Sequence, residues 1–419
     1  CFTSLSLARY FKNYFKLVPI YDDLISKKKF RKVFNKFYFI KDHISGESSK
    51  SKINKVVKYL REDKSDCLFI TAPENVAWLL NLRGRDSPHS PIPNCRVILK
   101  NNSEIYLFVN KSKMQNLPLR KKSLKINIIS EDKINFFLND LLSKKIILDR
   151  LSCSVAYTNL LKNRINISNK NDPIYNMKSI KNEIEIKNFI KSHILDGVAV
   201  IKFLYWIKNY KKSLSELDTV KKLNFFRKKN KNYLFPSFDT ISASGPNGAI
   251  IHYRVNKNSN RNLKKNDIFL CDSGGQYKYG TTDITRTISL GNQPNEIKNI
   301  FTYVLKGHIA VANSNLNKLK SAHLIDSLAR KYLKKKGLDF PHGTGHGVGY
   351  FLNVHEGPIA ISKGYKIKLK PGHVISNEPG FYKKGKFGIR IENMIYVKQI
   401  KSKVFFENLT MVPIDKELI

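Results

Sequence analysis

The segment at residues 270–287 reads LCDSGGQYKYGTTDITRT and consists of two strand-like runs joined by the turn-prone GGQYKYG. We expect an antiparallel hairpin with its turn centred on Tyr277 and Lys278, so that Asp272 faces Asp283 directly. Opposed like charges destabilise a sheet by a few tenths to about 1 kcal/mol, and a bound cation reverses the sign of that contribution. The alternative is a pair of solvated aspartates, which the apolar neighbours in both runs disfavour. The hairpin is therefore a candidate cation site.

A second hairpin pattern at residues 372–397 repeats this logic. The runs GHVISNE and GIRIENMIYV flank PGFYKKGKF, and Glu378 and Glu392 are symmetric about Gly385. A single Glu in a strand usually faces solvent. Two hairpins that each bring a pair of carboxylates together are much harder to explain in that way. We therefore expect the two hairpins to face each other.

A histidine-rich segment, PHGTGHGVGYFLNVHEGP (341–358), lies between the two hairpins. Its glycines let the backbone pack close to a metal or a substrate, and imidazole is both a common ligand and the usual proton carrier near neutral pH. A phosphate-binding glycine loop is a weaker alternative, because no strand–turn–helix context is evident. We favour an active site that includes His342, His346 and His355. A further histidine, His252, ends the apolar run in GPNGAIIHYR.

Four carboxylates and one imidazole from these segments form a mostly oxygen-rich ligand set. Such a set suits Mn²⁺, Co²⁺, Zn²⁺ or Fe²⁺ better than a thiolate site would. The chemistry is that of a two-metal hydrolase, and the five candidate ligands are Asp272, Asp283, His346, Glu378 and Glu392.

The first part of the chain alternates helical and strand-like patterns. The apolar residues of SKINKVVKYLRED fall on one helix face, and NVAWLLNL (75–82) predicts a second helix. We expect an α/β domain at residues 46–173, because proline at position 173 disfavours a continuing helix. Residues 1–45 are interpreted as the remnant of a preceding domain or a linker. The expected strands are CLFIT (67–71), RVILK (96–100), EIYLFVN (104–110) and KIIL (145–148).

The remaining residues, 174–419, predict a second domain that mixes helices and strands. An amphipathic helix is expected over roughly residues 180–208, and its His193 is interpreted as an ordinary histidine. From residue 238 the sequence becomes strand-rich and is punctuated by glycine. Helical patterns interrupt it near residues 295–313 and 321–336. The two domains together predict an α+β fold.

The formal net charge of +42 suggests a nucleic-acid or anionic-membrane partner. Lysine is spread over the whole length, however, and the densest cluster, KKLNFFRKKNKN (221–232), carries no nucleic-acid-binding signature. We attribute the charge to biased composition and expect no nucleic-acid partner. The sequence contains no uninterrupted run of about 20 apolar residues, so we expect no membrane span.

The five cysteines are scattered along the chain and form no CxxC pair. This pattern argues for a reducing compartment and against a disulfide framework, so we expect a cytoplasmic protein. Cys271 lies next to Asp272, and in a strand its side chain would point to the opposite face. We interpret it as a small core residue.

Four segments resemble the aminopeptidase P (Xaa-Pro aminopeptidase) family of pita-bread metallopeptidases, of the cytosolic three-domain type. They are ISASGPNGAIIHYR, LCDSGGQYKYGTTDITRT, HGTGHGVGYFLNVHEGP and SNEPGFYKKGKFGIRIENM. The likeness runs from about residue 178 to the end and extends upstream through AWLLNLRGRDSPHSP. It implies a C-terminal pita-bread catalytic domain preceded by a creatinase-like α/β domain. Only about 45 residues precede that domain, so we expect a fragment that lacks most of the first domain and the C-terminal end.

The resemblance implies a role for each candidate ligand. Asp272 matches a ligand of one metal only. Asp283 and Glu392 match carboxylates that bridge two metals, and His346 and Glu378 match ligands of the second metal. The family generally uses two Mn²⁺ ions, and Zn²⁺ or Co²⁺ can occupy the site.

The implied reaction removes the N-terminal residue from peptides with proline in the second position. His252 and His355 match histidines that hydrogen-bond the substrate and the tetrahedral intermediate, and His342 and Arg390 match supporting active-site residues. We hypothesise that a metal-bridged hydroxide attacks the first peptide bond. Glu378 would accept the water's proton and relay it to the leaving proline nitrogen.

Other members of the fold remain as alternatives at this point. Prolidase, creatinase-like hydrolases and methionine aminopeptidase share it, and GPNGAIIHYR together with the histidine-rich segment favours aminopeptidase P. A non-catalytic pita-bread module that binds protein or nucleic acid is disfavoured, because all five ligands are present. The resemblance also implies a homodimer acting on peptides.

Overall fold

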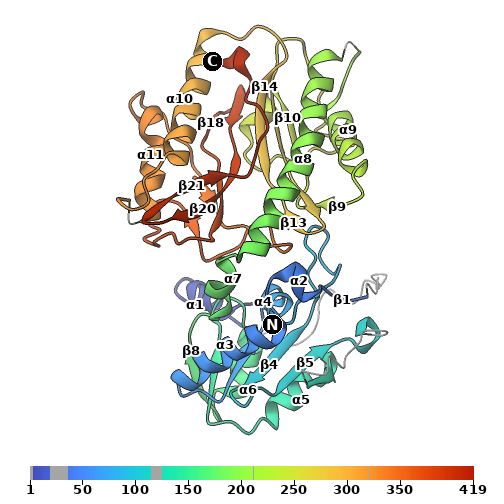
Figure 1. Ribbon diagram of the computed structural model, residues 1–419, viewed down its shortest axis with the longest axis vertical. Coiled ribbons are helices and arrows are strands. Elements are labelled where there is room, and N and C mark those ends of the chain that lie inside the picture. The colour runs from blue at the N-terminus through green and yellow to red at the C-terminus, as the bar shows by residue number, and fades with distance from the viewer. Residues whose placement is uncertain (1–2, 19–35, 115–124, 211, 320) are drawn as a thin grey trace. The chain divides into compact units, whose positions relative to one another are not determined.

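The computed structural model describes residues 3–18, 36–114, 125–210, 212–319 and 321–419 (Figure 1). Its contacts divide the chain into two units, Cys1–Lys178 and Ser179–Ile419, and each is described by itself. Cys1 and residues 19–35 of the predicted N-terminal segment lie outside the described residues. Within the described ranges, no helix is both long and apolar enough to span a membrane.

The first unit is built around a mixed sheet with the strand order β6-β5-β4-β2-β7-β8. The predicted strands are confirmed, and RVILK and KIIL match β4 and β7 residue for residue. The sheet strands are β2 (Cys67–Ile70), β4 (Arg96–Lys100), β5 (Ile105–Val109), β6 (Ile126–Ser130), β7 (Lys145–Leu148) and β8 (Asn166–Asn169). A separate short pair joins β1 (Tyr38–Phe39) to β3 (Leu82–Arg83).

The helices of the first unit follow the expected apolar faces. In α3 the Ser48 side chain accepts a hydrogen bond from the Ser51 amide and caps the helix, and the predicted face around Val56 and Leu60 is buried. The helix predicted over NVAWLLNL is confirmed as α4, although it ends at Leu79, because Leu82 begins strand β3. The helices are α1 (Leu5–Lys12), α2 (Asp42–Ser45), α3 (Ser49–Glu62), α4 (Pro73–Leu79), α5 (Ile134–Asn139) and α6 (Val155–Leu161), and α7 (Ile174–Ser179) spans the boundary between the units.

The start of the described chain is tied to the first unit by backbone hydrogen bonds. The amides of Leu5 and Ser6 donate to the carbonyls of Cys153 and Arg150, and Val155 donates to the carbonyl of Thr3. These bonds fix the entry to α1 against the segment that precedes α6.

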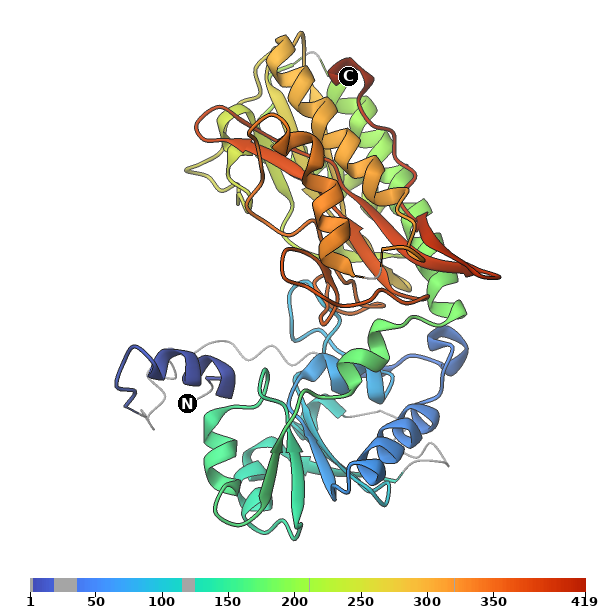
Figure 2. The same cartoon turned by 90° about the vertical axis from the view of Figure 1, so that its left-hand side faces the viewer.

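The second unit has helices on two sides of its strands (Figures 1 and 2). Helices α8 (Glu183–Asn209) and α9 (Glu216–Lys228) pack on the sheet β10-β11-β14, and α10 (Asn295–Ala312) and α11 (Ala322–Lys334) pack with β17-β20-β21. Helices α8, α10 and α11 lie where the sequence predicts helices, whereas α9 was not predicted. In α8, Asn182 and Glu185 form a reciprocal capping box, which explains why the helix begins at Glu183. As predicted, His193 is an ordinary core residue, with Nδ1 bonded to the Phe189 carbonyl.

The strands of the second unit are short and form several small sheets. They are β9 (Tyr233–Pro236), β10 (Ile241–Ser244), β11 (Ile268–Ser273), β12 (Gly275–Tyr277), β13 (Gly280–Thr281), β14 (Ile284–Ser289), β15 (Gly345–His346), β16 (Ala360–Ile361), β17 (Val374–Asn377), β18 (Gly380–Lys383), β19 (Phe387–Arg390), β20 (Asn393–Ile400) and β21 (Lys403–Asn408).

The predicted register of the first hairpin is wrong by two residues. Asp272 pairs with Thr285 rather than with Asp283, because Tyr277 pairs with Gly280 and the turn is centred on Lys278 and Tyr279. A shift of two residues keeps every side chain on its predicted face, since side chains alternate with a period of two. Asp272 and Asp283 are therefore diagonal neighbours on the same face, within reach of a shared ligand.

The predicted register of the second hairpin is confirmed. Asn377 pairs with Asn393 and Gly380 pairs with Arg390, so the strands on both sides are symmetric about Gly385. Gly385 has a φ of 69°, which favours glycine at the turn. Glu378 and Glu392 lie between these pairs, opposite one another.

Candidate metal centre

A cavity of about 480 Å³ in the second unit is lined by every site residue that the sequence predicts. Its walls come from both hairpins, from the histidine-rich segment and from the loop after β10. The predicted residues that line it are His252, Asp272, Asp283, His342, His346, His355, Glu378, Arg390 and Glu392. The remaining lining is partly apolar and includes Phe238, Ile241 and Ile251.

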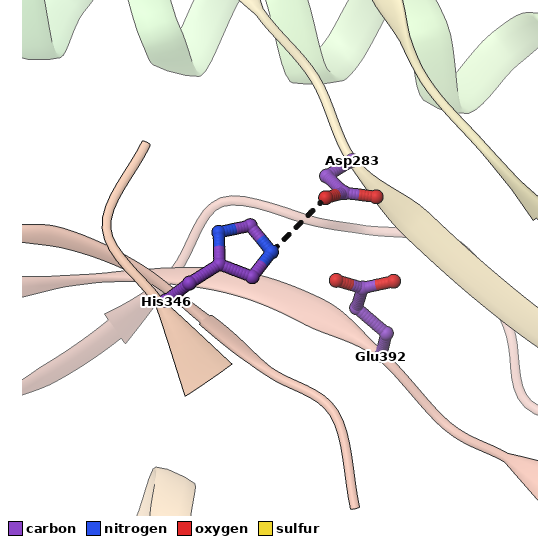
Figure 3. Close-up of side chains that lie close together, drawn as sticks. All are labelled: Asp283, His346 and Glu392. Carbon is purple, nitrogen blue, oxygen red and sulfur yellow. Dashed lines mark ion pairs between the residues drawn. The ribbon is translucent and has the colours of Figure 1, made fainter. Parts of the chain in front are cut away.

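Three of the predicted ligands converge on one point in this cavity (Figure 3). Ligand atoms of Asp283, His346 and Glu392 all lie within 4.8 Å of one another. His346 Nε2 lies 3.5 Å from Asp283 Oδ2 and 3.4 Å from Glu378 Oε1. Asp272 lines the same cavity from β11. The structure thus brings all five candidate ligands to one site.

The imidazole of His346 has the tautomer that a metal ligand requires. Its Nδ1 lies 3.0 Å from the Gly347 carbonyl oxygen, which can only accept a hydrogen bond, so Nδ1 carries the proton. In the neutral ring the lone pair is then on Nε2, the nitrogen that faces the carboxylates of Asp283 and Glu378. Lone pairs that face one another in this way fit an intervening cation.

The close approach of the backbone at this point requires glycine. A Cβ atom on Gly345, one residue before His346, would lie 1.9 Å from the Ser376 carbonyl oxygen. Glycine therefore lets β15 lie directly against β17 and delivers His346 beside Glu378. Ser376 Oγ serves both residues, because it accepts from the His346 amide at 2.9 Å and donates to Glu378 Oε1 at 2.9 Å.

The negative charges of the cavity carboxylates are only partly balanced by positive groups of the protein. Burial, together with the neighbouring carboxylates, raises the pKa of Asp283 and of Glu392 well above the ordinary range. Burial also raises the pKa of Asp272, although the Arg390 guanidinium opposes it. Asp272 Oδ1 is buried and has no hydrogen-bond partner among the described residues. Three buried carboxylates with one unused oxygen fit the oxygen-rich donor set of a divalent metal site.

A directed chain of hydrogen bonds leads away from Asp272. Arg390 donates to Asp272 Oδ2 at 2.7 Å and to the Tyr382 hydroxyl at 2.7 Å. The Tyr382 hydroxyl must then donate to His342 Nε2, 2.8 Å away, because His342 Nδ1 donates to the Gly343 carbonyl. This chain explains how Arg390 and His342 contribute to the site, and it fixes the orientation of Asp272.

Tyr382 is a site residue that sequence reasoning missed. It lies in β18 on the same face as Gly380, which pairs with Arg390, so the register of the second hairpin alone puts Tyr382 and Arg390 on one face. Thr285 is a second residue that sequence reasoning missed, and its hydroxyl donates to Glu392 Oε2 at 2.8 Å. Thr285 pairs with Asp272, whereas the predicted register paired Asp272 with Asp283.

Two histidines stand at the wall of the cavity beside the carboxylates. The rings of His355 and His346 meet edge to face with centroids 4.0 Å apart. Burial and the neighbouring His346 lower the pKa of His355 to about 4, so His355 is neutral near pH 7. His252 lines the same cavity from the loop after β10.

Removal of divalent cations is expected to destabilise the protein more at about pH 8 than at about pH 5. Without a cation, Asp283 and Glu392 have pKa values raised above those of the unfolded chain. The two carboxyl groups contribute fully to the stability of the folded metal-free protein at pH values below their pKa in the unfolded chain. That contribution is lost as the pH rises through their raised pKa values in the folded protein. A bound cation stabilises the ionised forms and offsets that loss. Thermal unfolding with and without chelator across this range measures the effect, and a chelator-induced change in Tm that is independent of pH would contradict it.

Comparisons with known proteins match both parts of the chain to known families. The model of "Metallopeptidase family M24" matches residues 187–399, and that of "Creatinase/Prolidase N-terminal domain" matches residues 31–185. A "Probable Xaa-Pro aminopeptidase P" from Laccaria bicolor is 37% identical over 97% of this chain and 66% of its own length. Another from Phaeosphaeria nodorum is 37% identical over 90% of this chain and 61% of its own.

Solved structures give the same picture. An X-prolyl aminopeptidase from Caenorhabditis elegans, described as a cytosolic enzyme with a di-nuclear active site, is 31% identical with a TM-score of 0.88. The match covers 96% of this chain and 69% of that one. The prolidase from Pyrococcus horikoshii is 26% identical with a TM-score of 0.72, over 88% of this chain and 100% of its own. The chain thus spans less than two thirds of the length of the curated relatives named above.

Proposed function

This chain belongs to metallopeptidase family M24, and we propose that it is a Xaa-Pro aminopeptidase that releases the N-terminal residue from peptides with proline in the second position. The observation that carries the proposal is the convergence of five metal-donor side chains and two flanking histidines in one cavity. The similarity to Xaa-Pro aminopeptidases over nearly the whole chain supports the choice of substrate.

We propose that Asp272, Asp283, His346, Glu378 and Glu392 hold two divalent cations, most readily Mn²⁺. The donor chemistry, four carboxylates and one neutral imidazole, supports this assignment, and Zn²⁺ or Co²⁺ also suits it. When bound, such ions polarise a substrate carbonyl and make water a stronger acid. Asp283 and Glu392 would bridge the two ions, Asp272 would bind one of them, and His346 and Glu378 would bind the other.

The chain's own residues supply the proton transfers and the orientation of the substrate. Glu378 is the proposed general base, because its carboxylate is partly exposed to the cavity and is held by Ser376 Oγ through one oxygen only. It would take a proton from the attacking water and deliver it to the leaving proline nitrogen. His355, which is neutral near pH 7, and His252 would donate hydrogen bonds to the oxygen that becomes negative during attack. Arg390 would hold Asp272 directly, and His342 would support Arg390 through the Tyr382 hydroxyl.

We propose the same domain assignment that the sequence suggests. Residues 174–419 would form the catalytic pita-bread domain, and residues 46–173 the creatinase-like domain. The Caenorhabditis elegans enzyme described as cytosolic supports a cytoplasmic location. We further propose a homodimer that acts on peptides and binds neither nucleic acid nor membrane.

Xaa-Pro-Yaa tripeptides are expected to be cleaved faster than Xaa-Pro dipeptides in the presence of Mn²⁺. The cavity of about 480 Å³ has an apolar wall at Phe238, Ile241 and Ile251, which suits the apolar part of a peptide that continues beyond proline. Release of the first residue from matched pairs such as Ala-Pro-Ala and Ala-Pro measures the preference. Hydrolysis of the dipeptide alone would contradict the proposal and indicate a prolidase, and hydrolysis of neither would indicate a non-catalytic binding module.

A further inference from the structure

The first carboxylate hairpin is held from behind by a buried charged group, Asp196 of α8. Asp196 is 3% exposed, and each of its two carboxylate oxygens accepts two hydrogen bonds. Arg227 of α9 binds both oxygens, with Nε at 2.7 Å and Nη2 at 3.1 Å. Although burial opposes ionisation, the Arg227 charge lowers the pKa of Asp196 below its usual value. Asp196 is therefore a permanent anion fixed between two helices.

The other donors to this group come from the hairpin itself. The hydroxyls of Tyr277 and Thr282 donate to Asp196 at 2.8 Å and 2.9 Å. Arg227 Nη2 also lies 3.1 Å from Ser273 Oγ. All of these side chains are at most 1% exposed. Asp196 and Arg227 thus connect α8 and α9 to three residues of the hairpin.

Two of those three residues are the immediate neighbours of candidate metal ligands. Ser273 follows Asp272, and Thr282 precedes Asp283. Successive side chains of an extended chain point to opposite faces. Ser273 and Thr282 therefore face the helices, and the two aspartates face the cavity.

The two segments are also packed too tightly to move separately. A Cβ atom on Gly274 would lie 2.0 Å from the Thr282 carbonyl oxygen. The Gly275 amide donates to Thr282 Oγ1 at 2.9 Å, and Ser237 Oγ donates to the Thr282 carbonyl at 2.9 Å. A displacement of Thr282 must therefore displace the backbone that carries Asp283.

We propose that Asp196 and Arg227 are positioning residues that set the separation of Asp272 and Asp283 by holding Ser273 and Thr282, and thereby set the affinity of the site for divalent cations. The proposal rests on the proposed two-cation site. The competing explanation is that this group only stabilises the fold, as any buried and fully paired ion pair would when one partner is lost. The two explanations predict different effects on Mn²⁺ affinity. Tyr277 and Thr282 both donate to Asp196, but only Thr282 is next to a candidate metal ligand, so only its hydroxyl should affect Mn²⁺ affinity if the proposal is correct.

The test compares Thr282→Val with Tyr277→Phe in the full chain. Each variant deletes one hydroxyl donor to Asp196 and nearly preserves side-chain volume, and Thr282→Val also removes the acceptor of the Gly275 amide. Affinity for Mn²⁺ is measured by competition with a chelator, the geometry of the site by the visible absorption of the Co²⁺-loaded protein, and folding by Tm. We expect Thr282→Val to weaken Mn²⁺ binding about tenfold and to shift the Co²⁺ bands. We expect Tyr277→Phe to lower Tm and to leave Mn²⁺ affinity unchanged. Thr282→Ser keeps the hydroxyl, so we expect it to bind Mn²⁺ as the unmodified protein does.

Ser273→Ala provides a second variant that removes the hydroxyl acceptor beside Asp272 with little risk to folding. It is expected to weaken Mn²⁺ binding as well. The inference is overturned if Thr282→Val and Ser273→Ala bind Mn²⁺ like the unmodified protein, or if Tyr277→Phe weakens binding equally. If the unmodified protein binds no Mn²⁺, the proposed function fails instead, so the two failures are distinguishable.

Discussion

Replacement of Glu378 by Gln is expected to lower kcat for Xaa-Pro-Yaa hydrolysis by about 10²- to 10⁴-fold, the usual contribution of a positioned general base. The amide is nearly isosteric, and its oxygen can still accept the hydrogen bond from Ser376 Oγ. It cannot accept a proton from water near neutral pH. The loss should therefore appear in kcat at saturating Mn²⁺, measured together with the metal content of the variant.

A control for this variant is Glu407→Gln. Glu407 lies in β21 of the same unit, outside the cavity lining, and its carboxylate pairs with Lys398. Its replacement is expected to leave kcat unchanged. Near-normal turnover by Glu378→Gln with both cations bound would rule out the proposed proton transfer by Glu378.

Replacement of Asp283 by Asn is expected to have two effects of opposite sign. Mn²⁺ affinity should fall by more than the roughly 10- to 100-fold that is typical when only a partner of a ligand is lost. The metal-free protein should become more stable at neutral pH, because the variant removes one of several buried, mutually repelling carboxylates. Chelator competition and thermal unfolding of the metal-free protein measure the two effects.

The matched control for this variant is Asp267→Asn. Asp267 is paired with Arg261 and lies outside the cavity lining. Loss of its charge should lower the stability of the metal-free protein and leave Mn²⁺ affinity unchanged. If Asp283→Asn lowered the Tm of the metal-free protein as Asp267→Asn does, the carboxylate cluster would not be the strained, cation-requiring site described above.

Sequence patterns predicted the elements well where local chemistry determines them. The strands predicted at RVILK and KIIL have the same first and last residues as β4 and β7. Glycine at position 385 fixed the turn of the second hairpin and therefore the pairing of Glu378 with Glu392. The same reasoning interpreted Cys271 as a core residue, and it is buried against α8 and α9.

The errors and omissions concern contacts between distant parts of the sequence. The turn GGQYKYG offers several possible centres, so its sequence could not select the register that pairs Asp272 with Thr285. The period of two nevertheless kept both aspartates on the correct face. Asp196 lies in the middle of a long helix, and nothing local indicates that it binds Arg227 and Tyr277. Its role depends on the packing of α8 and α9 against the hairpin.

The central claim is that two divalent cations in this cavity support cleavage before proline. Titration of the metal-free protein with Mn²⁺, while release of the first residue from Ala-Pro-Ala is followed, tests it most directly. We predict no release without metal and activity that saturates when two equivalents are bound. Full activity of the metal-free protein, or no release of alanine with two equivalents bound, would contradict the account.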